Sequence, residues 1–100
     1  MVMWFNVPEA RVELLKEKHV FTLRPKRRKR EGHEILMYNG FGKKGDLEVE
    51  YWGKFSKMSH TLVREIAKNS GFKSLEDWLK VAKDADYLYY VRLLEEKTQK

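Results

Sequence analysis

The segment Tyr87-Leu88-Tyr89-Tyr90-Val91-Arg92-Leu93-Leu94 decides the fold class, because its residues predict a β-strand with two largely apolar faces. Side chains alternate between the two faces of a strand. The odd-numbered residues of 87–94 therefore form one apolar face, and Leu88, Tyr90 and Leu94 dominate the other. A strand that is apolar on both faces is typically covered from both sides. We expect this strand to lie in the middle of a sheet, with packed elements above and below it.

Further segments predict strands that can surround the central one. They cover residues 1–5, 20–24, 34–38 and 47–55. In the last of these, alternation predicts that one face carries Leu47, Val49, Tyr51, Gly53 and Phe55. A glycine inside such an apolar row indicates a bulge or a sharp bend, as small barrels require. The long strand is thus expected to bend at Gly53.

Three helices are predicted from cap residues and apolar spacing. The first covers residues 8–18 and can be capped by Asn6, with proline in the first turn, where its missing N–H costs nothing. Ser59 can cap the second helix, and Gly71 is expected just past its end. Ser74 can cap the third helix, whose buried stripe is expected to consist of Leu75, Trp78, Leu79 and Ala82. These elements predict an α+β protein in which residues 1–100 form a single domain.

The charge of the chain is concentrated in one short stretch. The 100 residues include 21 Lys and Arg against 15 Asp and Glu, a formal net charge of +6, and six of the basic residues lie in 24–30. Clustered cations repel one another unless an anion neutralises them, and nucleic-acid phosphates are common partners of this kind. Residues 26–30, which we call the basic loop, therefore predict nucleic-acid binding. The alternatives are a solvated loop and binding to an acidic lipid or protein.

Composition excludes several other classes. A content of 42% hydrophobic and 13% aromatic residues supports a folded core, and the lack of cysteine excludes disulfide scaffolds, thiolate metal sites and cysteine nucleophiles. The three histidines lack the spacing of a metal site, so no metal or cofactor is expected. No apolar run approaches the roughly 20 residues of a membrane helix, which predicts a cytoplasmic protein without a membrane partner. The charged fraction of 36% is typical of thermophile proteins.

The strand at 20–24 carries the residues that we expect to contact a ligand. Thr22 and Arg24 point to the same face of an extended backbone, so a hydroxyl and a guanidinium lie side by side, with Lys18 or His19 nearby. Such groups can bind a carbonyl or a phosphate and can assist proton transfer. Trp52 is out of phase with the apolar face of its own strand. It is therefore the candidate for an accessible platform on which a base can stack.

Residues 14–24, 29–36, 70–77 and 87–93 together resemble the ASCH domain family. The first stretch is similar to the family's helix and turn leading into a Lys-x-x-[Thr/Glu]-x-Arg strand, with Thr22 and Arg24 at the last two of these positions. The lysine position falls on His19, and Lys18 lies one residue earlier. The other stretches resemble the Gly-Asp turn before the family's second strand, its second-to-third helix junction and its closing strand.

This resemblance implies a PUA-like fold, a small and partly open β-barrel flanked by helices, with an RNA-binding cleft beside the strand that carries Thr22. The family also includes small acetylcytidine amidohydrolases, which use a Lys, a Thr and a Glu, and members reported to cleave RNA. For an enzyme, the resemblance implies Lys18 and Thr22 as catalytic residues. The position of the family glutamate falls near Asn69 or Ser70, neither of which is acidic.

We therefore expect an RNA-binding domain, taken to be a monomer, that uses the basic loop and the adjacent cleft. The residues expected to bind RNA are Thr22, Arg24, Lys26, Arg27, Arg28, Lys29, Arg30 and Trp52. One alternative is a nucleoside amidohydrolase of the acetylcytidine type, or a ribonuclease, acting in the same cleft. Another is a protein-interaction module with an incidental basic loop.

Overall fold

The computed structural model describes residues 2–5, 7–27, 31–38, 42, 44–83 and 85–94. Within these residues the strands are β1 (Val2–Trp4), β2 (His19–Arg24), β3 (Gly32–Met37), β4 (Gly45–Lys54) and β5 (Tyr87–Leu94). The helices are α1 (Pro8–Glu17), α2 (His60–Ala67) and α3 (Leu75–Ala82), and a short 3-10 helix, η1 (Phe55–Lys57), follows β4. The strands and α1 begin and end within two residues of their predicted bounds.

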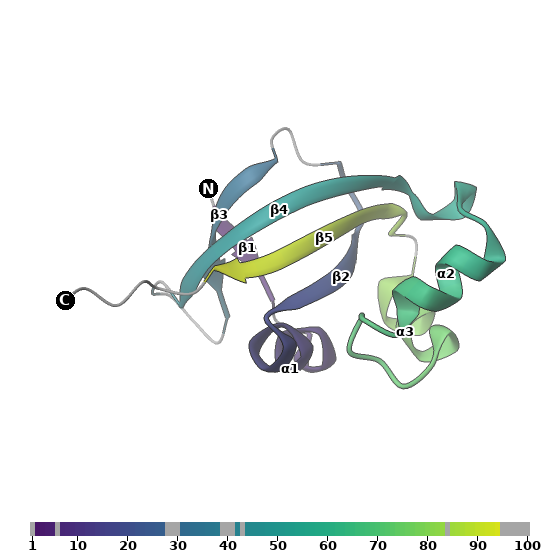
Figure 1. Cartoon of the computed structure of the whole chain (residues 1–100), viewed down its shortest axis with the longest axis horizontal. Helices are drawn as coiled ribbons and strands as arrows, with labels where there is room; N and C mark the ends of the chain where they lie inside the picture. Colours follow the sequence, from purple (N-terminus) through teal and green to yellow (C-terminus); the bar gives the residue numbers. More distant parts are fainter. Residues whose placement is uncertain are drawn as a thin grey trace.

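In the described part of the chain, β5 lies inside a sheet of five strands, between β4 and β2 (Figure 1). The strand order is β1-β3-β4-β5-β2, in which β1 and β3 are parallel and the other neighbours are antiparallel. The sheet curls into a half-barrel whose edge strands are β1 and β2, and the helices flank it. The predicted α+β class, with a small, partly open β-barrel flanked by helices, is confirmed.

The two faces of β5 belong to different hydrophobic clusters, as the sequence predicted. Tyr89 and Val91 point into the half-barrel, which α1 closes with Leu14. Leu88 points to the outer face, where Trp78 of α3 and residues of α2 cover it. The inner cluster consists of Met3, Phe5, Ala10, Leu14, Val20, Leu36, Leu47, Val49, Tyr89 and Val91. The outer cluster consists of Phe21, Leu23, Ile66, Ala67, Trp78 and Leu88.

The predicted irregularity at Gly53 is present, and it changes which residues of β4 face the barrel. Pairing steps from Tyr51 opposite Tyr89 directly to Gly53 opposite Leu88, so Trp52 is the additional residue of a β-bulge. Gly53 has a φ of +118°, which glycine adopts easily. One additional residue reverses the alternation beyond it. Phe55 therefore packs in the outer cluster, and its predicted place on the face of Tyr51 is wrong.

Two serine caps begin α2 and α3, as predicted. The Ser59 hydroxyl accepts a hydrogen bond from the Leu62 backbone N–H at 3.2 Å, and the Ser74 hydroxyl accepts one from the Asp77 N–H at 3.1 Å. The first residue of α1 follows Val7, which makes no side-chain cap, and the predicted cap Asn6 lies outside the described residues. Among the helices of the described residues, none combines the length and the apolar character needed to cross a membrane.

Two predictions about the helical region are wrong. Leu79 is 40% exposed, so the buried stripe of α3 consists of Trp78 with the partly buried Leu75 and Ala82. Gly71 does not end α2, which stops at Ala67. Its φ of +89° places it in a turn that packs against the first turn of α1, and a Cβ at this position would lie 2.2 Å from the carbonyl oxygen of Glu9. Glycine is therefore needed at position 71 because two segments approach each other closely there, and not because a helix ends there.

The cap of α3 provides a first stability prediction. Replacing Ser74 with Ala is expected to lower the free energy of unfolding by about 1 kcal/mol, because the Asp77 N–H loses its acceptor at the helix start. Ser74→Asp retains an acceptor and is expected to stay near the wild-type value. Urea denaturation followed by tryptophan fluorescence measures both variants. An equal loss in Ser74→Asp would contradict the capping role.

Candidate functional site

A pocket of about 280 Å³ lies where the half-barrel remains open. Trp4 and Phe5 come from the end of β1, and Thr22 and Arg24 come from β2, so the two edge strands face each other across it. Helix α3 covers the remaining side with Trp78. The other lining residues are Val7, Ala10, Leu23, Pro25, Phe72, Val81, Ala82 and Ala85. The pocket is thus mainly apolar and aromatic, with a hydroxyl and a guanidinium in one wall.

Alternation along β2 explains why Thr22 and Arg24 lie together. Val20 belongs to the inner cluster and Phe21 to the outer one, so the even-numbered side chains of β2 face the barrel interior. Thr22 is 8% exposed. The Arg24 guanidinium carbon lies 4.9 Å from the centre of the Phe5 ring, within the range of a cation–π contact. This wall can donate hydrogen bonds to a carbonyl oxygen or a phosphate.

The basic loop begins at the rim of this pocket. Pro25 lines the pocket, and the next residues, Lys26 and Arg27, are exposed. The Arg27 guanidinium carbon lies 4.4 Å from the centre of the Tyr51 ring, and the Tyr51 backbone N–H donates to a Glu31 carboxylate oxygen at 2.8 Å. Arg27 and Glu31, which lie on either side of residues 28–30 in the sequence, therefore both contact Tyr51 of β4. The predicted contact residues Arg28, Lys29 and Arg30 lie outside the described residues.

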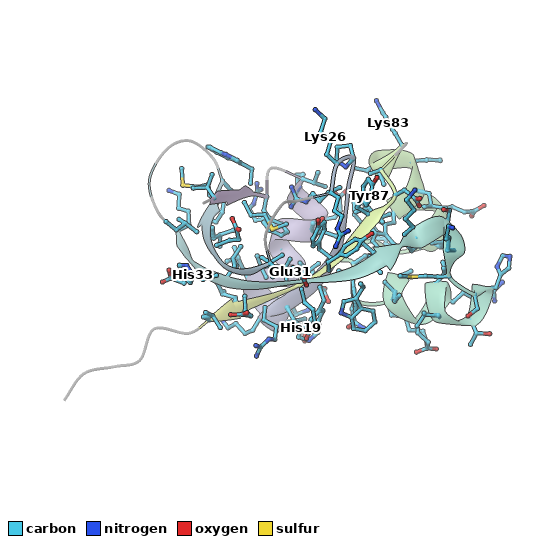
Figure 2. The ribbon with its side chains drawn as sticks, turned by 90° about the horizontal axis from the view of Figure 1, so that it is seen from above. His19, Lys26, Glu31, His33, Lys83 and Tyr87 are labelled. Carbon is cyan, nitrogen blue, oxygen red and sulfur yellow. The ribbon has the colours of Figure 1, made fainter. Side chains whose placement is uncertain are left out.

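Tyrosines extend this positively charged rim along the inner face of the sheet. The rings of Tyr51 and Tyr87 are 6.3 Å apart, and the Lys54 ammonium lies 5.8 Å from the centre of the Tyr87 ring. Both tyrosines are half-buried. Figure 2 shows Tyr87 and Lys26 on the same side of the sheet. Cations beside half-exposed aromatic rings are the groups that bind the phosphates and bases of a single strand.

Trp52 is accessible, but it does not lie with Thr22 and Arg24. Its ring is 43% exposed on the outer face, 4.8 Å from the ring of Phe21. The Trp52 indole N–H donates to a Glu50 carboxylate oxygen at 2.8 Å. The neighbouring carboxylate repels phosphates, and Trp52 is not among the described residues that line the pocket. The prediction of an exposed ring is confirmed, and the structure does not bring this ring into the cleft.

Lys18 and His19 also lie away from the pocket. Lys18 ends α1 in a left-handed conformation with a φ of 71°, and it is exposed. The His19 ring lies 5.8 Å from the ring of Tyr90 on the outer face, and Figure 2 shows it on the opposite side of the sheet from Tyr87. Neither residue is among the described residues that line the pocket with Thr22.

Sequence reasoning did not single out Glu34, a buried carboxylate of the half-barrel. Glu34 is 2% exposed and shares the inner face of β3 with Leu36. The alternation of β3 puts Glu34 on the same face as Leu36, and this pattern could have identified it as a buried carboxylate.

Asn69 is one of the two residues that the resemblance to ASCH domains places near the position of the family glutamate. Its backbone carbonyl accepts a hydrogen bond from the Phe21 N–H at 2.9 Å. Among the described residues, no group of three or more His, Cys, Asp and Glu side chains is arranged to hold a metal ion.

Comparisons of the chain with models of known protein families, with curated proteins and with solved structures found no match.

Proposed function

We propose that the protein binds single-stranded RNA, with an unstacked base in the pocket and the adjoining phosphates on the basic loop. One observation carries this proposal. Thr22 and Arg24 line an aromatic pocket whose rim continues directly into Lys26 and Arg27. An apolar pocket that can hold a base therefore adjoins a run of basic residues that can bind phosphates. Proteins that bind single-stranded nucleic acid combine these two features. The resemblance to ASCH domains points in the same direction.

The pocket is suited to one base. Its volume of about 280 Å³ is close to the lower end of the roughly 300–1,000 Å³ that is usual for small-molecule sites. The rings of Trp4, Phe5 and Trp78 supply apolar wall area. The Arg24 donors and the Thr22 hydroxyl can bond to the polar edge of a base. A base paired within a duplex cannot reach such a pocket, so we expect a single strand to bind more tightly than a duplex of the same sequence.

The alternative reading as an amidohydrolase or ribonuclease has less support from the described geometry. Thr22 lines the pocket, which favours a substrate near its hydroxyl. However, His19 occupies the outer face and Lys18 lies at the other end of β2. A hydroxyl without an adjacent base is a weak nucleophile. The alternative hypothesis of a protein-interaction module gives no role to the pocket or to the basic loop that begins beside it.

Arg24 tests the proposal directly. In fluorescence anisotropy with an unstructured RNA of about twelve nucleotides, Arg24→Gln is expected to weaken binding by about tenfold or more, because a charge-assisted hydrogen bond inside the pocket is lost. Arg64→Gln is the matched control, since Arg64 is exposed on α2. Urea denaturation checks that both variants are folded. Absence of RNA binding by the wild-type protein, or equal losses in the two variants, would sink the proposal.

A further inference from the structure

Lys83 lies next to the part of the pocket wall that the end of α3 forms. It follows the last residue of α3 and stands between Ala82 and Ala85, both of which line the pocket. The side chain of Lys83 is exposed. Lys26 likewise follows Pro25, which also lines the pocket. Figure 2 shows the Lys26 and Lys83 side chains extending from the same side of the molecule, above Tyr87.

The backbone of Lys83 has a conformation that side chains with a Cβ disfavour. Its φ is 54° and its ψ is −114°, which lies outside the regions that ordinary residues occupy. Glycine would adopt this conformation without steric cost. Strained residues of this kind occur preferentially at ligand sites, where the surrounding structure holds them in place. Lys83 is therefore a candidate for contact with a ligand.

The segment around Lys83 is fixed by hydrogen bonds on both sides. The Lys83 N–H donates to the Leu79 carbonyl at 2.9 Å, and the Ala85 N–H donates to the Ala82 carbonyl at 3.0 Å. The Asp86 carboxylate accepts from the backbone N–H and the hydroxyl of Ser56, at 2.7 Å and 2.8 Å. The two Asp86 bonds tie the segment to η1. Lys83 is thereby held next to Ala82 and Ala85, which line the pocket.

We infer that Lys26 and Lys83 bind a single phosphate group across the mouth of the pocket, so that the site takes one phosphorylated nucleoside. The base would lie against Arg24 and the aromatic walls, and the phosphate would lie between the two ammonium groups. Two ammonium groups next to a phosphate neutralise its charge and form charge-assisted hydrogen bonds. This inference rests on the proposed function and adds the ligand unit that the pocket recognises. The phosphate can belong to a free nucleotide or to the backbone of an RNA.

Calorimetric titration of the full chain with the four ribonucleoside 5′-monophosphates and the four nucleosides tests the inference. We expect at least one monophosphate to bind about tenfold more tightly than its nucleoside. Lys83→Gln and Lys26→Gln should each remove most of this preference, and Lys83→Arg should retain it. Lys80→Gln is the matched control, because Lys80 is an exposed lysine of α3, three residues before Lys83. Lys83→Gly should raise the urea midpoint while removing the phosphate preference.

Equal binding of monophosphates and nucleosides, or an unchanged preference in Lys83→Gln, would overturn the inference. In that case RNA binding that depends on Arg24 would still support the proposed function. Conversely, monophosphate binding that depends on both lysines, without any RNA binding, would overturn the proposed function and support a nucleotide site. RNA oligomers with and without a 5′-phosphate separate the two phosphate sources. A preference for the phosphorylated end indicates a terminal phosphate, and equal affinity that still depends on Lys83 indicates a backbone phosphate.

Discussion

Replacing Arg27, Arg28 and Arg30 with Ala is expected to reduce the salt dependence of RNA binding by more than half. If the five cations of the basic loop each contact one phosphate, the slope of log affinity against log salt is about −3.5 for a single strand. Raising the salt from about 50 to about 200 mM then weakens binding by roughly 130-fold. With three contacts removed, the slope falls to about −1.4 and the loss to roughly 7-fold. Fluorescence anisotropy across a salt series measures both slopes.

A charge-matched control separates the basic loop from the overall charge of the protein. Arg64, Lys68 and Lys73 are exposed and line a hollow between α2 and α3. Their replacement with Ala also lowers the formal net charge from +6 to +3. We expect this control to keep a slope near the wild-type value. If the two triple variants lost equal affinity and equal slope, RNA would be attracted by net charge alone, and the role of the basic loop would be refuted.

Gly71→Ala is expected to destabilise the protein by about 2–4 kcal/mol, from the combined costs of a strained φ and of overpacking. The added Cβ would lie 2.2 Å from the Glu9 carbonyl oxygen and 2.9 Å from the Glu13 Cβ, so α1 and the segment before α3 must separate. Both of the opposing groups belong to a helix and cannot rotate away. Urea denaturation, followed by the fluorescence of Trp78 and the other tryptophans, measures the loss.

Gly32→Ala distinguishes the clash from the backbone strain. Gly32 has a φ of +107°, but no atom lies within 4 Å of the place where its Cβ would be. We expect this variant to cost about 1 kcal/mol, the strain contribution alone. Equal losses at Gly71 and Gly32 would show that α1 moves away from the added Cβ without a further cost. A larger loss at Gly71 shows that the close approach to α1 cannot open without a cost in stability.

The features that could be predicted from the sequence are those set by local pattern. The two apolar faces of β5 predicted an interior strand, because alternation is a property of the strand itself. The serine caps at Ser59 and Ser74 depend on atoms three residues away, and both formed. Thr22 and Arg24 share a face for the same local reason as the residues of β5. These parts required no knowledge of distant segments.

Other features depend on contacts between segments far apart in the chain. Gly53 signalled a bulge, but the sequence did not reveal that Trp52 would be the additional residue or that Phe55 would change faces. The pocket joins Thr22 with Phe5 and Trp78, which come from distant parts of the chain, and no local pattern brings them together. The local pattern around Gly71 predicts a helix end, but glycine is needed there because of α1, which is more than fifty residues away in sequence.

β1 and β2 are the two edge strands of the sheet, and this affects how the protein can associate with other chains. An unpaired strand edge is a template on which another chain can add a strand. β1 is only three residues long, and the Phe21 N–H of β2 is already bonded to the Asn69 carbonyl. Pro25 lacks an N–H, and Lys26 adds charge where β2 ends. Lys26, which we propose to contact RNA, therefore also protects this edge of the sheet from pairing with another chain.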